Sequence, residues 1–120
     1  MTLPDHLPDR LVELIAQRFR VIGDPMRIRL LDQLRHSEAS VQELTDAIGG
    51  SQQNTSKHLG TLHAAGIVSR RKEGTRTVYA IEDYAVFELC EQVCGSLQRQ
   101  IAALSDLLDE VEQGPPIAAS

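Results

Sequence analysis

The sequence has little cysteine and no long apolar run. Its 120 residues include only two cysteines, four positions apart, so they provide no disulfide framework. No apolar stretch approaches the roughly 20 residues that a membrane-spanning helix needs. The opening residues, MTLPDHLPDR, lack the charged and then apolar pattern of a secretory signal. We therefore expect a single cytoplasmic domain of ordinary size.

The motifs of common enzyme classes are also missing. The sequence has no nucleophile elbow and no glycine-rich loop of the kind that cradles phosphate. It has no pair of carboxylates that would fall in a credible cleft for acid–base chemistry. We therefore expect that the protein is not an enzyme.

The stretch from residue 40 to residue 81 carries signals for two short helices followed by a hairpin. Ser40 and Glu43 match the S-x-x-E capping box, which begins a helix. A pair of glycines ends that helix, and Ser51 can cap the next one. This order of elements predicts a winged helix-turn-helix, a module that reads DNA.

Helical spacing separates an inner and an outer face on both helices. The inner face of the first comprises Val41, Leu44, Ala47 and Ile48, and that of the second Thr55, Leu59 and Leu62. The outer face of the second helix comprises Gln53, Asn54, Lys57, Gly60, Thr61 and Ala64. Amides and hydroxyls can pair with base edges in the major groove, and small residues permit close approach. An ordinary solvated helix face is the alternative.

The hairpin has strand-forming residues on both sides of a basic tip. The strand formers are Ile67, Val68, Val78, Tyr79 and Ile81. Glu73 and Gly74 supply the turn between them. Four cations surround the tip: Arg70, Arg71, Lys72 and Arg76. Such a wing can contact phosphates beside the groove that holds the helix. A merely solubilising hairpin tip is the alternative.

The net charge of −5 is unusual for a DNA-binding protein, but it is unevenly distributed. Residues 1–50 carry −2, residues 51–81 carry +4 and residues 82–120 carry −7. Because salt screens exposed charges beyond about 8–10 Å, the positive region can act on phosphates despite the acidic remainder.

Two more helices are expected before the winged region. Residues 1–8 contain two prolines and form an irregular tail, after which Asp9 can cap a helix that ends at Gly23. Asp24 and Pro25 begin the next helix, with proline at a tolerated first position. In that helix, Met26, Leu30, Leu31 and Leu34 pack inward, and Arg27, Arg29 and Arg35 remain outside.

A long helix is expected from residue 83 to residue 113, followed by a flexible tail over 114–120. Its apolar stripe is too long for one small domain to cover, so burial against a second copy of the chain is the simplest solution. Together with the first helix, 9–23, it would form the dimer interface of a domain spanning 9–113. The candidate interface residues are Leu11, Leu14, Ile15, Val93, Leu97, Ile101, Leu104 and Leu108.

Three segments together resemble the ArsR/SmtB family of small winged-helix regulators. They are IGDPMRIRLL (22–31), SKHLGTLHAAGIV (56–68) and KEGTRTVY (72–79), and the resemblance spans about residues 11–100. It implies a mainly α-helical fold with a β-hairpin wing, in which four helices and two strands precede a fifth helix. It also implies a homodimer that binds an imperfect palindrome in double-stranded DNA. Members of this family usually repress, and an inducer weakens the DNA complex.

From the residues and the resemblance together, we expect a set of DNA contacts on the second helix of the motif and on the wing. The set is Ser51, Gln53, Asn54, Ser56, Lys57, His58, Thr61, Arg70, Arg71, Lys72 and Arg76. His58 would lie at the boundary between the core and the DNA.

The sequence departs from the resemblance at the inducer sites. Relatives with a soft-metal site place a cysteine pair where this chain reads Glu38 to Gln42, without a thiol. Others build a metal site across the dimer on the last helix. The corresponding positions here are Asp83, Ala85, Ser96 and Arg99, of which only Asp83 can ligate a metal.

Cys90 and Cys94 are the remaining candidates for a metal or redox site. One helical turn separates them, so both sulfurs can lie on one face and bind As(III) or a transition-metal ion such as Cd(II), Cu(I) or Zn(II). The thiols could instead be oxidised, or simply pack in an apolar interface. A metal-responsive, a thiol-responsive and an effector-independent regulator therefore stay open, as does a winged-helix module that binds acidic proteins.

Overall fold

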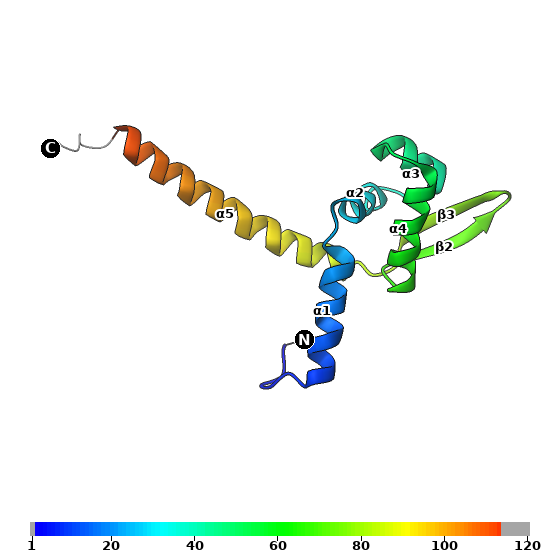
Figure 1. Cartoon of the computed structure of the whole chain (residues 1–120), viewed down its shortest axis with the longest axis horizontal. Coiled ribbons are helices and arrows are strands. Elements are labelled where there is room, and N and C mark those ends of the chain that lie inside the picture. The colour runs from blue at the N-terminus through cyan, green and yellow to red at the C-terminus, as the bar shows by residue number, and fades with distance from the viewer. Residues whose placement is uncertain (1, 114–120) are drawn as a thin grey trace. The chain divides into compact units, whose positions relative to one another are not determined.

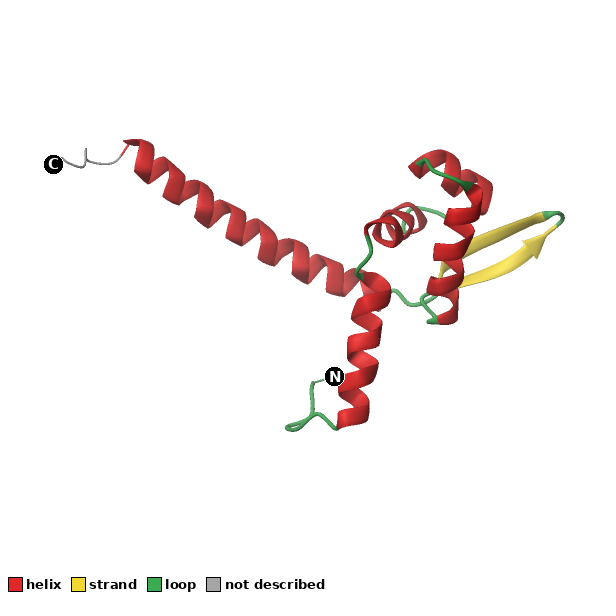
Figure 2. Ribbon diagram, viewed as in Figure 1, coloured by secondary structure: helices red, strands yellow, loops and turns green. Residues whose placement is uncertain are grey.

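The computed structural model describes residues 2–113 as five helices and one small antiparallel sheet (Figures 1 and 2). The helices are α1 (Asp9–Ile22), α2 (Pro25–Leu34), α3 (Val41–Ile48), α4 (Gln52–Ala64) and α5 (Ala85–Gln113). The strands are β1 (Ala39–Ser40), β2 (Val68–Glu73) and β3 (Arg76–Ile81). The residues up to Asp83 form one compact unit, here called the N-terminal unit, and α5 belongs to a second. The predicted winged helix-turn-helix is confirmed.

The sheet has the strand order β1-β3-β2, with both neighbouring pairs antiparallel. The strand β1 was not predicted; it pairs Ala39 with Tyr79 and Ser40 with Val78. The turn also lies one residue later than expected, because Glu73 is still in β2 and pairs with Arg76. Gly74 and Thr75 form the loop, and Gly74 takes a φ of 66°, which glycine allows without strain.

The core of the N-terminal unit is formed by one face of each helix and by the base of the hairpin. Its buried apolar residues are Ile22, Leu30, Leu31, Leu34, Leu44, Leu59, Leu62, Ile67, Val68, Val78, Tyr79 and Ile81. Leu30, Leu59 and Leu62 are 0% exposed, in agreement with the inner faces predicted for α2 and α4. Packing of this kind fixes how α4 presents its outer face.

Side-chain caps define where α2 and α3 begin. The Asp24 carboxylate accepts hydrogen bonds from the amides of Met26 (2.9 Å) and Arg27 (3.2 Å). The hydrogen bond from Arg27 is the main reason that the pKa of Asp24 lies below its ordinary value. The predicted capping box of α3 is confirmed, since Ser40 and Glu43 bond each other's amides (3.1 and 2.9 Å).

Three predictions about these helices were wrong in detail. Pro8, not Asp9, occupies the N-cap of α1, and no side chain caps that end. Ala47 is exposed, whereas Thr45 is buried, and its hydroxyl is satisfied by donating to the Val41 carbonyl (2.8 Å). Arg27 does not stay outside; it is half-buried and bonds α1 through its guanidinium.

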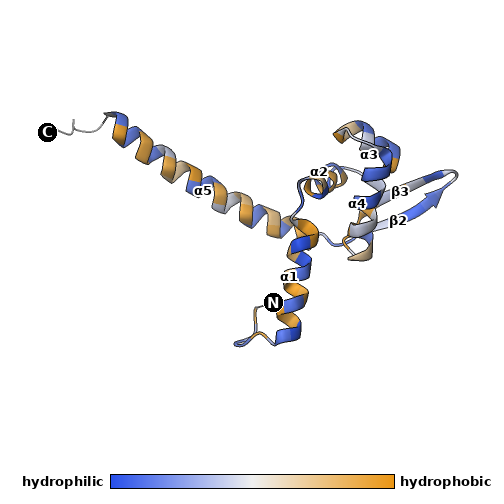
Figure 3. Ribbon diagram, in the orientation of Figure 1, coloured by the Kyte–Doolittle hydropathy of each residue, from blue (hydrophilic) through white to orange (hydrophobic). Residues whose placement is uncertain are grey.

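The helix α5 runs from Ala85 to Gln113, within the predicted 83–113. Figure 3 shows apolar residues recurring along its length. Val86 is buried in its first turn, whereas the exposed apolar residues are Val93, Leu97, Ile101, Leu104, Leu107, Leu108 and Val111. Among the described residues, no helix is both long and apolar enough to cross a membrane. The predicted tail at 114–120 lies outside the described residues.

Candidate nucleic-acid interface

The start of α4 is fixed by Ser51 and by a buried threonine one turn later. The Ser51 hydroxyl accepts a hydrogen bond from the Asn54 amide (3.0 Å), as predicted for an N-cap. Thr55 is 0% exposed, and its hydroxyl donates to the Ser51 carbonyl (3.1 Å). Gly49, two residues before Ser51, takes a φ of 81° and ends α3, so α3 and α4 meet at a tight turn.

The first half of α4 presents an uninterrupted polar surface. From residue 52 to residue 57, every side chain except that of the buried Thr55 is exposed: Gln52, Gln53, Asn54, Ser56 and Lys57. Thr61 is half-buried, and its hydroxyl donates to the Lys57 carbonyl (3.3 Å). The amides, the Ser56 hydroxyl and the lysine are therefore the groups that this helix offers to a partner.

His58 is turned toward α2 instead of outward. It is half-buried, and its Nδ1 lies 3.0 Å from Nη1 of Arg27. Because a guanidinium only donates, Nδ1 is the acceptor in this bond. Arg27 also donates from Nε to the Val21 carbonyl (2.6 Å) and from Nη2 to the Arg20 carbonyl (3.3 Å). The Arg27 side chain thus joins the end of α1 to α4.

The register of the hairpin separates its basic residues into two faces. Arg70 pairs with Tyr79 and Lys72 with Thr77, so Arg70 and Lys72 share one face. Arg71 pairs with Val78, so it lies on the other face of the hairpin. Arg70, Arg71, Lys72, Thr77 and Tyr79 together line a shallow cavity of about 400 Å³.

Two arginines of the wing are held by carboxylates from outside the wing or from its tip. Arg71 donates to both Glu38 oxygens (2.8 and 2.6 Å) and to Glu73 (2.6 Å). These bonds raise the pKa of Arg71 above its ordinary value, and the Arg71 hydrogen bonds hold the pKa of Glu38 below its own. The role of Glu38 was not predicted, because nothing local in the sequence marks a partner 33 residues away.

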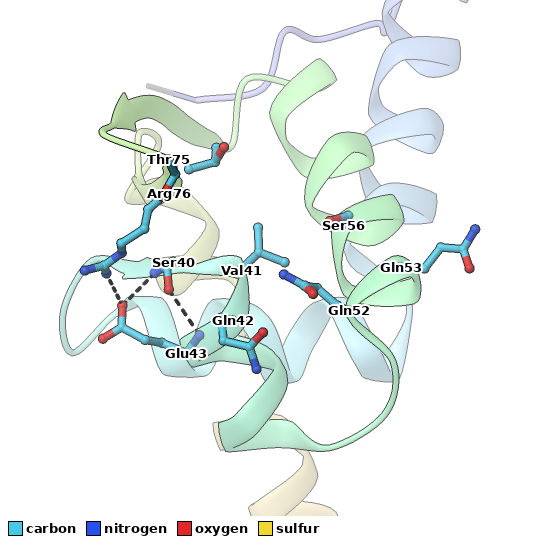
Figure 4. Close-up of a pocket in the computed structure, with 10 residues that line it drawn as sticks. Ser40, Val41, Gln42, Glu43, Gln52, Gln53, Ser56, Thr75 and Arg76 are labelled. Atoms are coloured by element: carbon cyan, nitrogen blue, oxygen red, sulfur yellow. Dashed lines mark hydrogen bonds and ion pairs between the residues drawn. The ribbon is translucent and has the colours of Figure 1, made fainter.

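Arg76 is paired in a similar way with the capping residue of α3. Its Nη2 donates to Oε1 of Glu43 at 2.7 Å, and the same oxygen accepts the Ser40 amide. The bond from Ser40 is the first cause that lowers the pKa of Glu43, and Arg76 contributes further. Figure 4 shows the bonds that join these three residues.

A groove of about 790 Å³ lies between the starts of α3 and α4 and the strand β3. Its lining residues are Ser40, Val41, Gln42, Glu43, Gln52, Gln53, Ser56, Thr75, Arg76 and Thr77. In Figure 4, the Gln52 side chain points toward Val41 and the Gln53 side chain points away from it. Of the predicted DNA contacts, Gln53, Ser56 and Arg76 line this groove, and Gln52, Thr75 and Thr77 are lining residues that were not singled out from the sequence.

The candidate dimer residues are at least partly exposed on their helices. On α1, Leu14 is 45% exposed, and Leu11 and Ile15 are half-buried. On α5, the candidates Val93, Leu97, Ile101, Leu104 and Leu108 are between 50% and 66% exposed. Both helices carry an apolar face that the single chain leaves open.

The two cysteines lie on α5, Cys90 half-buried and Cys94 exposed. Within residues 2–113, no three or more histidine, cysteine, aspartate or glutamate side chains come together in a group that could hold a metal ion. Two thiols from one chain supply half of a four-coordinate thiolate site, so a soft metal at this place needs further ligands from elsewhere.

Comparison with known proteins gives matches over most of the chain. A family model described as a helix-turn-helix domain matches residues 22–71. The chain is 37% identical over 86 residues to the HTH-type transcriptional regulator KmtR of Mycobacterium tuberculosis, covering 72% of this chain and 66% of KmtR. The chain thus spans slightly under two thirds of the length of that relative.

A second relative matches over nearly its whole length. Rv0081 of Mycobacterium tuberculosis, described as an uncharacterised HTH-type transcriptional regulator, is 31% identical over 105 residues, covering 87% of this chain and 92% of Rv0081. Its crystal structure gives a TM-score of 0.71 over 84% of this chain and 99% of that chain. The solution structure of Mb0332 from Mycobacterium bovis, a homodimeric winged helix-turn-helix domain, is 24% identical with a TM-score of 0.59 over 92% of each chain, which shows the fold.

Proposed function

Because the chain belongs to the ArsR/SmtB family of helix-turn-helix transcriptional regulators, we propose that it regulates transcription as a homodimer bound to a palindromic operator. The family comprises transcriptional regulators rather than enzymes. The observation that carries this proposal is the polar first half of α4, exposed beside a basic hairpin. Residues 9–113 would act together as the functional domain.

In this proposal α4 enters the major groove and the wing lies over the phosphate backbone. Gln53 and Asn54 are amides that can pair with adenine, and Ser51, Ser56 and Thr61 offer hydroxyls to bases or phosphates. Lys57, Arg70 and Lys72 supply charge for the backbone, and the ion-paired Arg71 and Arg76 belong to the same basic wing. His58 keeps α4 in place through Arg27, so its role is to position the helix.

A homodimer follows from the open apolar faces of α1 and α5. A second copy of the chain would cover both faces by the same residues, as a two-fold interface requires. The description of Mb0332 as homodimeric supports this assembly for a chain of the same fold. Two copies of α4 would then reach successive turns of the major groove, which accounts for a palindromic target.

We further propose that DNA binding represses the target genes and that an effector acts through α5. In a two-fold dimer, Cys90 and Cys94 from both chains could gather four thiols, which suits a soft transition-metal ion. Oxidation of the pair is the other candidate signal. Native mass spectrometry of the reduced protein with As(III), Cd(II), Cu(I) and Zn(II), repeated after Cys90→Ser and Cys94→Ser, tests the metal: loss of a bound ion in the double variant is expected, and retention would exclude these ligands.

The proposed function is tested by selecting binding sites from a random duplex library. We expect an inverted repeat to be enriched and the native chain to protect both halves in a footprint. Lys57→Gln should weaken binding to the selected site, whereas Arg29→Gln, on the exposed side of α2, should leave it unchanged. Failure to enrich any duplex at low ionic strength would contradict the proposal and favour a module that binds acidic proteins.

A further inference from the structure

The basic residues of the wing fall into a restrained set and an unrestrained set. Arg71 and Arg76 are held in ion pairs, whereas Arg70 and Lys72 make no ion pair among the described residues. We propose that Glu38 restrains Arg71 and thereby limits the affinity of the protein for duplex DNA. In the native protein, Arg70 and Lys72 are then the residues of the wing that contact phosphates. This inference rests on the proposed function and names the residues that set its strength.

The geometry at Arg71 leaves little of its guanidinium for a phosphate. Three of its hydrogen bonds go to carboxylates, two to Glu38 and one to Glu73, at 2.6 to 2.8 Å. The bidentate pair with Glu38 uses the planar fork that would otherwise match a phosphate. A DNA phosphate must therefore compete with two anions for this side chain.

The side chains of Arg71, Glu38 and Glu73 are also accessible to DNA. Their exposed fractions are 47% for Arg71, 50% for Glu38 and 53% for Glu73. Glu38 lies in the link before β1, so its carboxylate stands at the edge of the same small sheet. A phosphate that approached Arg71 would be repelled by the adjacent Glu38 carboxylate, which lowers affinity for any duplex irrespective of sequence.

Glu43 differs from Glu38 because it has a structural task. Its Oε1 accepts both the Ser40 amide and Arg76, so it caps α3 while it pairs with the wing. No hydrogen bond of the described residues joins Glu38 to any group other than Arg71. Glu38 can therefore be neutralised without removing a cap, and it is the suitable site for a test.

The pairing also corrects the charge expected from the sequence. Residues 51–81 carry +4, but Glu38 and Glu43 lie outside that range and each neutralises one of its arginines. The cations in that range that have no ion pair among the described residues are Lys57, Arg70 and Lys72. The native salt dependence should accordingly reflect these three cations of each chain.

The test compares native protein with Glu38→Gln in fluorescence anisotropy, using the full-length chain, the selected duplex and a duplex of unrelated sequence. We expect the variant to bind both duplexes several-fold more tightly. The slope of log affinity against log salt should steepen by roughly 0.9 for each phosphate contact that is gained. A second substitution, Arg71→Gln, made in the Glu38→Gln protein, should abolish the gain.

Asp32→Asn is the matched control. Asp32 pairs with Arg35 at 2.7 Å on α2, with exposed fractions of 56% and 53%, so its substitution frees an arginine and changes net charge equally away from the wing. An equal gain in Asp32→Asn would overturn the inference in favour of a general charge effect. Unchanged or weaker binding by Glu38→Gln would also overturn it, the latter because Glu38 would then orient Arg71 for DNA. If native protein binds no duplex at all, the proposed function fails instead.

Discussion

The N-terminal unit and α5 solve the burial of apolar side chains in opposite ways. The N-terminal unit encloses a core in which Leu30, Leu59 and Leu62 have no exposed surface. By contrast, the large apolar side chains that recur along α5 from Val93 to Val111 are half-exposed or more, with Val111 at 79%. The first region encloses its own core, whereas the second leaves an apolar stripe exposed, which we propose is covered by a second copy of the chain.

Charge divides the two regions as well. Between Lys57 and Arg76 the N-terminal unit carries five basic residues, while α5 carries six acidic residues and one basic residue, Arg99. A basic surface suits contact with phosphates and an acidic helix does not. This division of charge supports our proposal that the first region contacts DNA and that α5, together with α1, forms the dimer interface.

The largest expected effect comes from placing a charge in the apolar stripe of α5. Leu97→Asp would bury an unpaired carboxylate in the proposed interface, which costs several kcal/mol. We expect the dimer dissociation constant to rise at least about a hundredfold, because 1.4 kcal/mol corresponds to a factor of ten. Gln98→Asp, one position off the stripe, is the control, and sedimentation equilibrium is the measurement. A dimer that survives Leu97→Asp would remove α5 from the interface.

Truncation in the enclosed core should destabilise the N-terminal unit itself. Leu59 is 0% exposed, so Leu59→Ala is expected to lower the free energy of unfolding by about 2–5 kcal/mol. Leu108→Ala on α5, where the side chain is 57% exposed, should cost less than this in the monomeric Leu97→Asp background. Urea unfolding followed by circular dichroism measures both, and equal losses would erase the distinction between the two regions.

The Arg27 side chain should contribute a smaller part of that stability. Arg27→Ala leaves the carbonyls of Arg20 and Val21 and the ring of His58 without a donor, at a cost of about 1–3 kcal/mol. Arg29→Ala, exposed on the same helix, is the matched control and should cost less than about 0.5 kcal/mol. If the two variants unfold at the same urea concentration, the Arg27 side chain that joins α1 to α4 contributes nothing to the free energy of unfolding.

The smallest expected effect is a loss of stability in acid. The pKa of Glu43 is lowered by the Ser40 amide and Arg76, and the pKa of Asp24 by the Arg27 and Met26 amides. A lowered pKa stabilises the folded state above the ordinary value, 4.5 for Glu43, and this contribution disappears as the pH falls through the folded value. The Glu43→Gln variant should therefore show a shallower loss of thermal stability below pH 4.5, and an unchanged pH profile would contradict the role of Glu43.

Local patterns in the sequence were sufficient to predict much of the N-terminal unit. The capping box at Ser40 involves residues three apart, and the buried face of α4 repeats at helical spacing, so both leave a readable signal. The glycines at the end of α3 are equally local, since a φ of 81° at Gly49 is a property of one residue.

Features that join distant residues could not be predicted in this way. Arg27 meets His58 across 31 positions, and Arg71 meets Glu38 across 33. The two-residue strand β1 is too short for any periodicity, and it exists because β3 offers it an edge. The same limit explains why the wing looked uniformly basic in sequence although two of its arginines are paired.

The central claim, that an acidic chain binds DNA through the N-terminal unit, is tested most directly by the salt dependence of binding to the selected duplex. We predict a linear fall of log affinity with log salt and a slope that becomes shallower by roughly 1 to 2 in Lys57→Gln, because the homodimer loses up to one phosphate contact in each copy. Binding that is insensitive to salt, or a slope that Lys57→Gln leaves unchanged, would contradict the claim.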